Sequence, residues 1–370
     1  MSKPKLKDGV SVMYREVEGQ KNTYEVNFLI ESSSIIIPFE MNDIAFQCLK
    51  YLDGNCTVED LSHCFGLSVV EVKKLIRLLE SYGLICSKNM SVDKFKYGRF
   101  SSQVNFFSGF EGAHTRDEMQ GKICKSHVVI LGIGGIGSWI AYSLVLAGVG
   151  TLTLIDNDVV EMGNLNRQCL YDRSEVGNSK ALVLGAKLQK FDSDLEIKLK
   201  RVKISSTIQY QEIMDLDVDL VINCADEPEM DTMNRIVSEA CFATGTPHIL
   251  CGGYDGHLGF IGPTVIPGES GCWFCYEQTL DHQLLRAGYK HLTVTPSQVK
   301  GGTLGAISSI VANYHVLDAI KVLSGFSRPT FVNKVAEVDF LTYGINFRKY
   351  GRIQNCSICR EICGGENDQS

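Results

Sequence analysis

Several features that define common protein classes are missing from this chain. No uninterrupted apolar run reaches the roughly 18 residues that a membrane-spanning helix requires. The first residues, Met-Ser-Lys-Pro-Lys-Leu-Lys-Asp, have no apolar core behind their lysines, unlike a secretory signal. We therefore expect a cytoplasmic protein with no membrane partner.

Basic residues also do not outnumber acidic residues. Lys and Arg total 36 against 43 Asp and Glu, a formal net charge of −7. This balance argues against a protein whose main task is to coat nucleic acid or an anionic membrane. Hydrophobic residues make up 44% and charged residues 21%, as in ordinary globular proteins, so disorder is excluded for most of the chain. The 370 residues leave room for two or three domains.

Familiar catalytic motifs are absent as well. The sequence contains no H-E-x-x-H, no G-x-S-x-G and no Walker lysine motif. Metalloprotease, serine-hydrolase and P-loop chemistries therefore lack support.

Residues 1–92 are predicted to form a small α+β domain. Segments 24–30 and 34–39 have the composition of paired strands. Three helices are expected next, the second beginning near Thr57 and the third with a capping box at Ser68. Apolar positions are Ile44, Phe46, Leu49 and Tyr51 in the first helix and Val72, Ile76, Leu78 and Leu79 on the buried face of the third. The pattern resembles a winged helix.

A winged-helix pattern raises the question of DNA binding. Basic residues of the third helix are offset by acidic neighbours, namely Lys73, Lys74 and Arg77 by Asp53, Glu59, Asp60 and Glu71. Because no basic face results, docking of a peptide or protein is favoured over DNA binding. A purely structural role is the other alternative.

A different pattern follows the polar and aromatic segment 93–124, which is predicted to be a connector. From residue 125 to 363, strands alternate with helices. Strands are expected at 126–131, 151–155, 220–224 and 248–251, and a helix at 138–147. This alternation predicts a Rossmann-like, mainly parallel sheet with helices on both faces, followed by a polar tail at 364–370.

A glycine-rich turn joins the first of these strands to its helix. Gly132-Ile-Gly134-Gly135-Ile-Gly137 lets backbone N–H groups approach a phosphate at a helix N-terminus. Asp156 ends the next strand, where a carboxylate can accept hydrogen bonds from ribose hydroxyls. The pattern suits NAD, FAD or ATP.

Later polar residues favour a triphosphate. Arg167, within Asn164-Leu-Asn-Arg-Gln168, and Lys180 are expected at the carboxyl end of the sheet, where ligands bind. Two fixed positive charges suit a polyphosphate. Asp226 follows another strand and can bind Mg²⁺ at the same edge. Taken singly, each basic residue could instead be a solvated surface charge.

Four of the 14 cysteines form two C-x-x-C pairs. Cys272, Cys275, Cys356 and Cys359 can supply four thiolates to a structural Zn²⁺. A redox pair is the alternative, and Cys363 could replace Cys359. Six single cysteines within apolar runs are predicted to be small buried hydrophobes: Cys48, Cys86, Cys169, Cys224, Cys241 and Cys251.

Over about residues 95–360, these motifs and their order resemble the ThiF/MoeB/HesA branch of the ubiquitin-like-protein activating superfamily. The run from Gly252-Gly-Tyr254 to Gly271-Cys272 is most similar to the peptide-modifying group that includes the enzymes of microcin C and pantocin A biosynthesis. The resemblance implies a homodimer that binds Mg-ATP and activates a carboxyl group as an acyl-adenylate.

The same resemblance assigns roles to residues. Arg167, Lys180, Asp226 and Arg99 would be catalytic, with Asp226 holding Mg²⁺. The implied cofactor contacts are Gly132, Gly134, Gly135, Gly137, Asp156, Asp158, Asn164, Arg167, Gln168 and Lys180. One position departs from the family, whose arginine-finger segment reads R-[YF]-x-R. Here Ser102 replaces the second arginine, which leaves adenylation and phosphorylation both open.

Relatives that transfer a ubiquitin-like protein to a thiol carry the nucleophile after the first C-x-x-C pair. Residues 279–300 contain no cysteine here, so a thioester relay is not expected. Arg286, Lys290 and His291 in this segment could steer an acidic peptide or form an ordinary solvated loop.

The resemblance implies ATP-dependent activation of a carboxyl group in a small ribosomally made precursor peptide, followed by intramolecular capture in peptide-antibiotic biosynthesis. The N-terminal module would bind the leader of the peptide as an added strand. Two alternatives are adenylation of a sulfur-carrier protein ending in Gly-Gly and a non-catalytic, nucleotide-dependent DNA-binding regulator.

Overall fold

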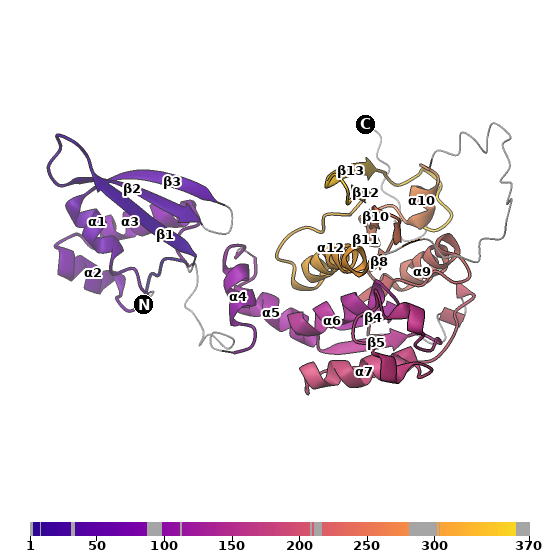
Figure 1. Cartoon of the computed structure of the whole chain (residues 1–370). Helices are drawn as coiled ribbons and strands as arrows, with labels where there is room; N and C mark the ends of the chain where they lie inside the picture. The colour runs from indigo at the N-terminus through magenta and orange to yellow at the C-terminus, as the bar shows by residue number, and fades with distance from the viewer. Residues whose placement is uncertain are drawn as a thin grey trace. The chain divides into compact units, whose positions relative to one another are not determined.

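The computed structural model describes the chain in two compact units, residues 1–120 and 121–370, which are treated separately (Figure 1). The described residues are 3–7, 9–30, 34–86, 98–111, 113–207, 209–210, 217–280, 302 and 304–359. The predictions for Arg286, Lys290, His291, Cys363 and the tail 364–370 lie outside these residues.

The first unit contains an antiparallel sheet in the order β1-β2-β3. Its elements are β1 (Val10–Glu16), β2 (Thr23–Ile30), β3 (Ile35–Asn42), α1 (Asp43–Leu49), α2 (Val58–Phe65) and α3 (Val69–Ser81). The two predicted strands are confirmed, and β1 precedes them as a third. Val26 and Phe28 are fully buried against the helices.

Capping boxes begin two of these helices. Thr57 and Asp60 form one at α2, and Ser68 and Glu71 form the other at α3, as the sequence predicts. One expectation for α3 is wrong, because Leu78 is 45% exposed. At helical spacing, Leu78 falls beside the buried stripe of Val72, Ile76 and Leu79 rather than within it. α1 ends at Leu49, so Tyr51 lies beyond it.

The described part of the predicted connector contains two helices. α4 (Ser101–Ser108) and α5 (Arg116–Lys125) occupy it, and the boundary between the two units falls within α5. Val104 and Phe107 of α4 are buried, so this segment contributes to packing.

A six-stranded sheet in the order β11-β8-β7-β4-β5-β6 forms the framework of the second unit. Its strands are β4 (His127–Leu131), β5 (Thr151–Ile155), β6 (Glu196–Lys200), β7 (Leu220–Asn223), β8 (His248–Leu250) and β11 (Thr264–Val265). All neighbours pair in parallel except β8 and β11. The predicted mainly parallel sheet is confirmed.

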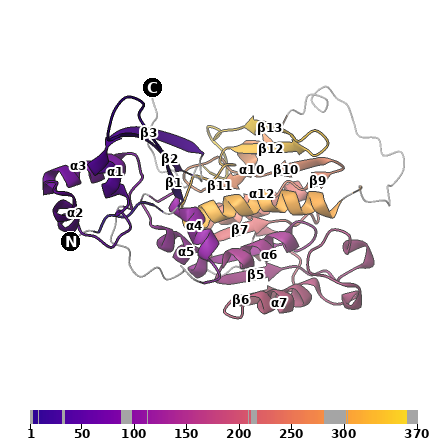
Figure 2. The same ribbon diagram turned by 60° about the vertical axis from the view of Figure 1, so that its left-hand side comes forward.

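Helices cover both faces of this sheet. They are α6 (Gly137–Ala147), α7 (Lys180–Phe191), α9 (Met230–Thr244) and α12 (Gly305–Ser324). The chain steps from β4 to β6 in one direction and from β7 to β8 in the other, so right-handed crossovers place α6 and α7 opposite α9. α12 lies beside α6 in both Figures 1 and 2.

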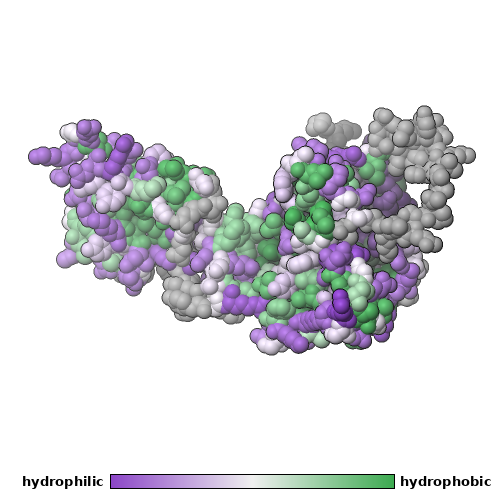
Figure 3. Space-filling model, in the orientation of Figure 1, coloured by the Kyte–Doolittle hydropathy of each residue, from purple (hydrophilic) through white to green (hydrophobic). Residues whose placement is uncertain are grey.

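A second, antiparallel sheet in the order β13-β12-β10-β9 follows. Its strands are β9 (Tyr254–Asp255), β10 (Leu258–Ile261), β12 (Lys334–Asp339) and β13 (Gly344–Lys349), and the short helix α10 (Trp273–Glu277) lies between β11 and α12 in sequence. Figure 3 shows hydrophobic surface over the β12–β13 hairpin, where Leu341 and Phe347 are 73% and 54% exposed.

Among the described helices, only α12 is long and apolar enough to cross a membrane. Half of the apolar window is buried within the protein, and Val311, Ala312 and Ala319 are at most 1% exposed. This burial identifies α12 as a core helix of the fold.

Candidate functional site

A polar cavity of about 330 Å³ lies at the carboxyl ends of β4, β5 and β7. It brings together most of the residues that the sequence singled out: Gly132, Gly134, Gly135, Asp156, Asp158, Asn164, Arg167, Gln168, Lys180 and Asp226. Parallel strands present their carboxyl ends at one edge, which explains why residues so far apart in sequence meet here.

The glycines of the turn between β4 and α6 have different structural roles. Gly132 has a φ of +75°, and a Cβ there would lie 2.8 Å from the backbone nitrogen of Ala225. Gly137 does not line the cavity, and a Cβ on it would overlap the Gly132 carbonyl oxygen. Gly132 and Gly137 therefore let the turn close against α6 and the residues that follow β7, and Gly132 also lines the cavity together with Gly134 and Gly135.

Asp156 joins this turn to the end of β5. Its two carboxylate oxygens accept hydrogen bonds from the backbone N–H groups of Ile133 (2.9 Å) and Asp158 (2.7 Å). Burial raises the pKa of Asp156 above its ordinary value, while these two hydrogen bonds oppose the rise. The remaining lone pairs of the carboxylate can accept hydrogen bonds from hydroxyl groups of a ligand.

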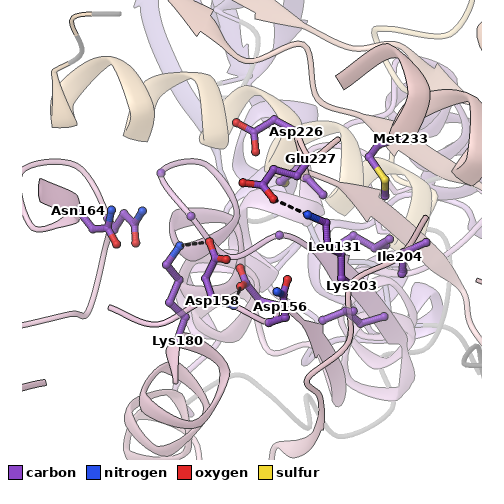
Figure 4. Close-up of a pocket in the computed structure, with 18 of the residues that line it drawn as sticks. Leu131, Asp156, Asp158, Asn164, Lys180, Lys203, Ile204, Asp226, Glu227 and Met233 are labelled. Atoms are coloured by element: carbon purple, nitrogen blue, oxygen red, sulfur yellow. Dashed lines mark hydrogen bonds and ion pairs between the residues drawn. The ribbon is translucent and has the colours of Figure 1, made fainter. Parts of the chain in front are cut away.

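Lys180 is the first residue of α7 and points toward Asp158, as Figure 4 shows. Its ammonium group lies 2.8 Å from Asp158 Oδ2, and its side chain is only 7% exposed. The backbone N–H of Lys180 also donates to the Asp158 carbonyl at 3.0 Å. Two bonds between the same residues fix this buried positive charge at the cavity wall.

The segment that contains Arg167 forms another part of the cavity wall. The indole N–H of Trp139 on α6 donates to the Arg167 carbonyl at 3.0 Å, and the Arg167 guanidinium donates to the Gly163 carbonyl at 2.7 Å. Gln168 is buried, yet its Oε1 atom has no hydrogen-bond partner among the residues that the structure describes. A buried amide oxygen without a partner at a cavity wall can accept a hydrogen bond from a polar ligand.

Asp226 and Glu227 follow β7 and lie across the cavity from Asp156 in the view of Figure 4. Glu227 forms an ion pair with Lys203 at 2.9 Å. Counted together, five acidic residues and three basic residues line the cavity: Asp156, Asp158, Glu161, Asp226 and Glu227 against Arg167, Lys180 and Lys203. An excess of carboxylates repels a bare polyphosphate but accommodates its complex with a divalent cation.

A second cavity of about 540 Å³ adjoins the first. Gly135, Arg167, Asp226 and Tyr254 belong to both. The second cavity extends toward uncharged residues, among them Met230, Cys251 and Gly253. The site therefore has a polar compartment and a less polar one that share a wall.

The four cysteines of the two C-x-x-C pairs come together as predicted. All four are buried, and their sulfur atoms lie within 4.8 Å of one another. Neighbouring Sγ–Sγ distances are 3.8 Å for Cys272–Cys275 and 3.5 Å for Cys272–Cys356 and Cys275–Cys359. A tetrahedron with Zn–S bonds of about 2.3 Å has sulfur atoms roughly 3.8 Å apart. The donor set thus fits a closed, structural zinc site.

The cysteine cluster belongs to a hydrophobic core shared with α9 and the parallel sheet. A hydrogen bond from Cys272 lowers the pKa of the Cys275 thiol to about 5, while burial raises that of Cys359 to about 12. Negative charge is therefore most easily carried by Cys275, which also accepts the Ile353 N–H at 3.4 Å.

The single cysteines follow the prediction only in part. Cys48, Cys169, Cys241 and Cys251 are buried, but Cys86 and Cys224 are partly exposed. Cys224 lies directly after β7 and lines both cavities, so its position at the sheet edge overrides its apolar sequence context.

Sequence reasoning missed several residues of the site. Lys203 follows β6 and Tyr254 begins β9, and both line the nucleotide-sized cavity. Lys203 could have been predicted, because ligands bind at the carboxyl ends of parallel strands and Lys203 follows β6. Tyr254 does not follow a strand of the parallel sheet, so its sequence position gave no such indication. Arg99 belongs to the first unit, where its guanidinium lies 5.2 Å from the Phe100 ring centroid, and its catalytic role stays a prediction.

Comparisons with known proteins identify relatives of this chain. The ThiS sulfur-carrier adenylyltransferase of Escherichia coli is 31% identical over 212 residues, covering 57% of this chain and 77% of that protein. The molybdopterin-synthase adenylyltransferase of E. coli is 26% identical over 238 residues, covering 63% and 87%.

Among solved structures, MccB of E. coli matches with a TM-score of 0.76 at 21% identity, covering 99% of both chains, which establishes a shared fold. MccB has been solved with ATP and, as the microcin C7 biosynthetic enzyme, with N-formylated MccA. The model of the ThiF family matches residues 100–358, which include the residues that line both cavities and three of the four clustered cysteines, and it ends one residue before Cys359. The chain belongs to the ThiF family.

Proposed function

We propose that this protein is an ATP-dependent enzyme that adenylates a carboxyl group of a small, ribosomally made precursor peptide. The observation that carries the proposal is the extent of the likeness to MccB. It covers 99% of this chain, whereas the match to the ThiS adenylyltransferase covers 57%. Residues 1–99 of the first unit, which precede the ThiF-family region, thus have a counterpart in an enzyme whose structures include a peptide.

In the proposed reaction, a carboxylate oxygen attacks the α-phosphorus of ATP. A new C(O)–O–P bond forms, and the bond from the α-phosphorus to the bridging oxygen breaks, with its electron pair leaving on pyrophosphate. Asp156 would hold the ribose, the glycine turn, Arg167 and Lys180 would stabilise the phosphates, and Asp226 would hold Mg²⁺. A nucleophile within the peptide would then displace AMP to give a cyclised or amidated product.

The first unit would bind the leader of the peptide. Within the described residues, β3 pairs only with β2, so its other edge is available for one more strand. Ile35 and Ile36 on this strand are 52% and 55% exposed. An extended peptide can add to such an edge through main-chain hydrogen bonds. The winged-helix-like arrangement would serve as the scaffold for this edge.

Three further features complete the proposal. The four clustered cysteines would hold a structural Zn²⁺, and two chains would form a homodimer to which Arg99 contributes across the interface. The protein would act in the cytoplasm. The protein would act in the biosynthesis of a peptide antibiotic, because its sequence resembles the enzymes of microcin C and pantocin A biosynthesis.

Identification of the nucleotide products tests this function. The protein would be incubated with Mg-ATP alone, with short peptides encoded beside its gene, and with a carrier protein ending in Gly-Gly. AMP and pyrophosphate that form only with a peptide support peptide adenylation, and the mass change of the peptide identifies the product. ADP and phosphate would instead indicate acyl phosphorylation.

Sulfur-carrier activation is the second candidate, because the 31%-identical relative is an adenylyltransferase of the carrier ThiS. Turnover with the carrier and with no peptide would favour it over our proposal. Absence of turnover with every substrate would favour the non-catalytic, nucleotide-dependent regulator.

A further inference from the structure

The wall between the two cavities is where the proposed chemistry must occur. The polar cavity contains the glycine turn and the basic residues suited to phosphates, and the second cavity is the less polar compartment beside it. If the α-phosphate lies at the glycine turn, the carboxyl group must reach it from the second cavity. A side chain common to both cavities then touches the reacting group from the acyl side.

Tyr254 occupies this position. It begins β9, lines both cavities and is half-buried. Its hydroxyl oxygen lies 2.7 Å from the point that a Cβ on Gly135 would occupy, and carbon atoms of the Arg167 side chain lie 3.6 Å from the same point. The phenol therefore rests directly on the glycine turn, next to Arg167, at a place that only glycine leaves open.

The hydroxyl of Tyr254 has no hydrogen-bond partner within the described part of the chain. Tyr171 provides the contrast, because its buried hydroxyl donates to the Ile133 carbonyl at 3.1 Å and so supports the same glycine turn. Tyrosine hydroxyls that are withdrawn from solvent usually have a partner. Tyr171 has such a partner within the fold, whereas the hydroxyl of Tyr254, a half-buried residue that lines both cavities, is available to a ligand.

We propose that the Tyr254 hydroxyl donates a hydrogen bond to an oxygen of the carboxyl group that is being activated. This inference rests on the proposed function and adds a substrate-contacting residue to it. Arg167 and Lys180 supply positive charge to the phosphates, while Tyr254 provides a neutral donor on the acyl side. A neutral donor can bind the carboxylate and the acyl oxygen of the product without holding a permanent charge in the less polar cavity.

Two ligands that differ only in an acyl group test the proposal. Adenosine 5′-sulfamate fills a nucleotide site, and its N-acetyl derivative stands in for an acyl-adenylate. Calorimetry would measure both affinities for the full-length wild-type protein and for Tyr254→Phe. We expect the variant to bind the acetyl derivative at least roughly tenfold more weakly, as loss of a hydrogen bond to a charged group predicts, and the sulfamate within about twofold.

Tyr171→Phe is the matched control, because it removes a hydroxyl that supports the same turn. It is expected to weaken both ligands by the same factor. Equal binding of the acetyl derivative by wild-type protein and Tyr254→Phe would overturn the inference, as would a parallel loss of both ligands in Tyr254→Phe. Wild-type protein that binds neither ligand would instead contradict the proposed function on which the inference depends.

Discussion

The side-chain amide of Asn223 donates a hydrogen bond to Asn234 Oδ1 at 2.7 Å, and both residues are fully buried. Asn223 ends β7 and Asn234 lies on α9, so the bond ties the strand to its crossover helix. Asn223 Oδ1 also accepts the Ala225 N–H at 3.2 Å. The amide pair thereby positions the backbone immediately before Asp226.

Asn234→Leu should loosen this backbone. The variant leaves the Asn223 amide without its partner in the interior, which costs about 1–3 kcal/mol of unfolding free energy. If Asp226 holds Mg²⁺, the Mg²⁺ concentration for half-maximal ATP binding should rise roughly tenfold, equivalent to about 1.4 kcal/mol. Urea unfolding and Mg²⁺ titrations measure both effects. Ser238→Ala, which breaks the buried Ser238–His248 contact between α9 and β8, should lower stability without changing the Mg²⁺ requirement.

Lys180→Ala should weaken ATP binding by roughly 10- to 100-fold, the range expected for a lost charge-assisted hydrogen bond. The variant also leaves Asp158 unpaired beside the phosphates. Lys187→Ala is the matched control on the same helix, because Lys187 pairs with Asp172 and Glu175 and does not line the cavity. Calorimetric titration with Mg-ATP compares the two. Equal losses in both variants would contradict a direct role for Lys180.

The purified protein should contain about one zinc ion per chain, since four clustered thiols form a complete tetrahedral site. Cys275→Ser should lose most of this metal and unfold at a lower temperature. Cys169→Ala removes a buried thiol outside the cluster and should retain the zinc. Elemental analysis and thermal unfolding measure the outcome. Metal-free wild-type protein with intact stability would exclude a structural zinc site.

Alanine substitutions at two glycines of the turn should differ sharply. Gly137→Ala places a Cβ against the Gly132 carbonyl oxygen and should destabilise the fold by about 3 kcal/mol or more. At Gly134 the added Cβ has its nearest neighbour, Gln168 Nε2, at 3.6 Å, so Gly134→Ala should fold normally. Denaturant unfolding of both variants tests the comparison. Similar stabilities would show that the turn adapts more readily than its packing indicates.

Two buried histidines should make the protein sensitive to moderate acid. Burial lowers the pKa of both His248 and His315 from 6.5 to about 4. The unfolded chain then binds more protons than the folded protein between these values, so stability present above pH 6.5 is lost as the pH falls toward 4. At pH 5 the lowered pKa of each histidine should reduce the free energy of unfolding by about 2 kcal/mol relative to neutral pH.

His315→Gln tests the contribution of one of these residues. His315 Nε2 accepts the Gly262 N–H at 3.0 Å, and a glutamine carbonyl can accept the same proton without titrating. Urea unfolding from pH 7 to pH 4.5 should show a shallower loss for the variant than for the wild type. Parallel curves would mean that this histidine is not neutral in the folded protein.

The sequence established the local features that depend on nearby residues. Hydrophobic patterning predicted strands at 126–131 and 151–155, which are β4 and β5, and capping residues located the starts of α2 and α3. The glycine turn between β4 and α6 and the paired cysteines could likewise be read directly. These signals suffice because a turn, a cap or a C-x-x-C pair is formed by residues a few positions apart.

Tertiary structure decided what depends on distant segments. It placed Tyr254 against Gly135, paired Lys180 with Asp158, and brought Cys272 beside Cys356. It also exposed Leu78 and left Cys224 at the edge of a cavity. Composition and periodicity cannot specify such contacts, because they arise only when the order of strands in the sheet and the packing of helices on its faces are set.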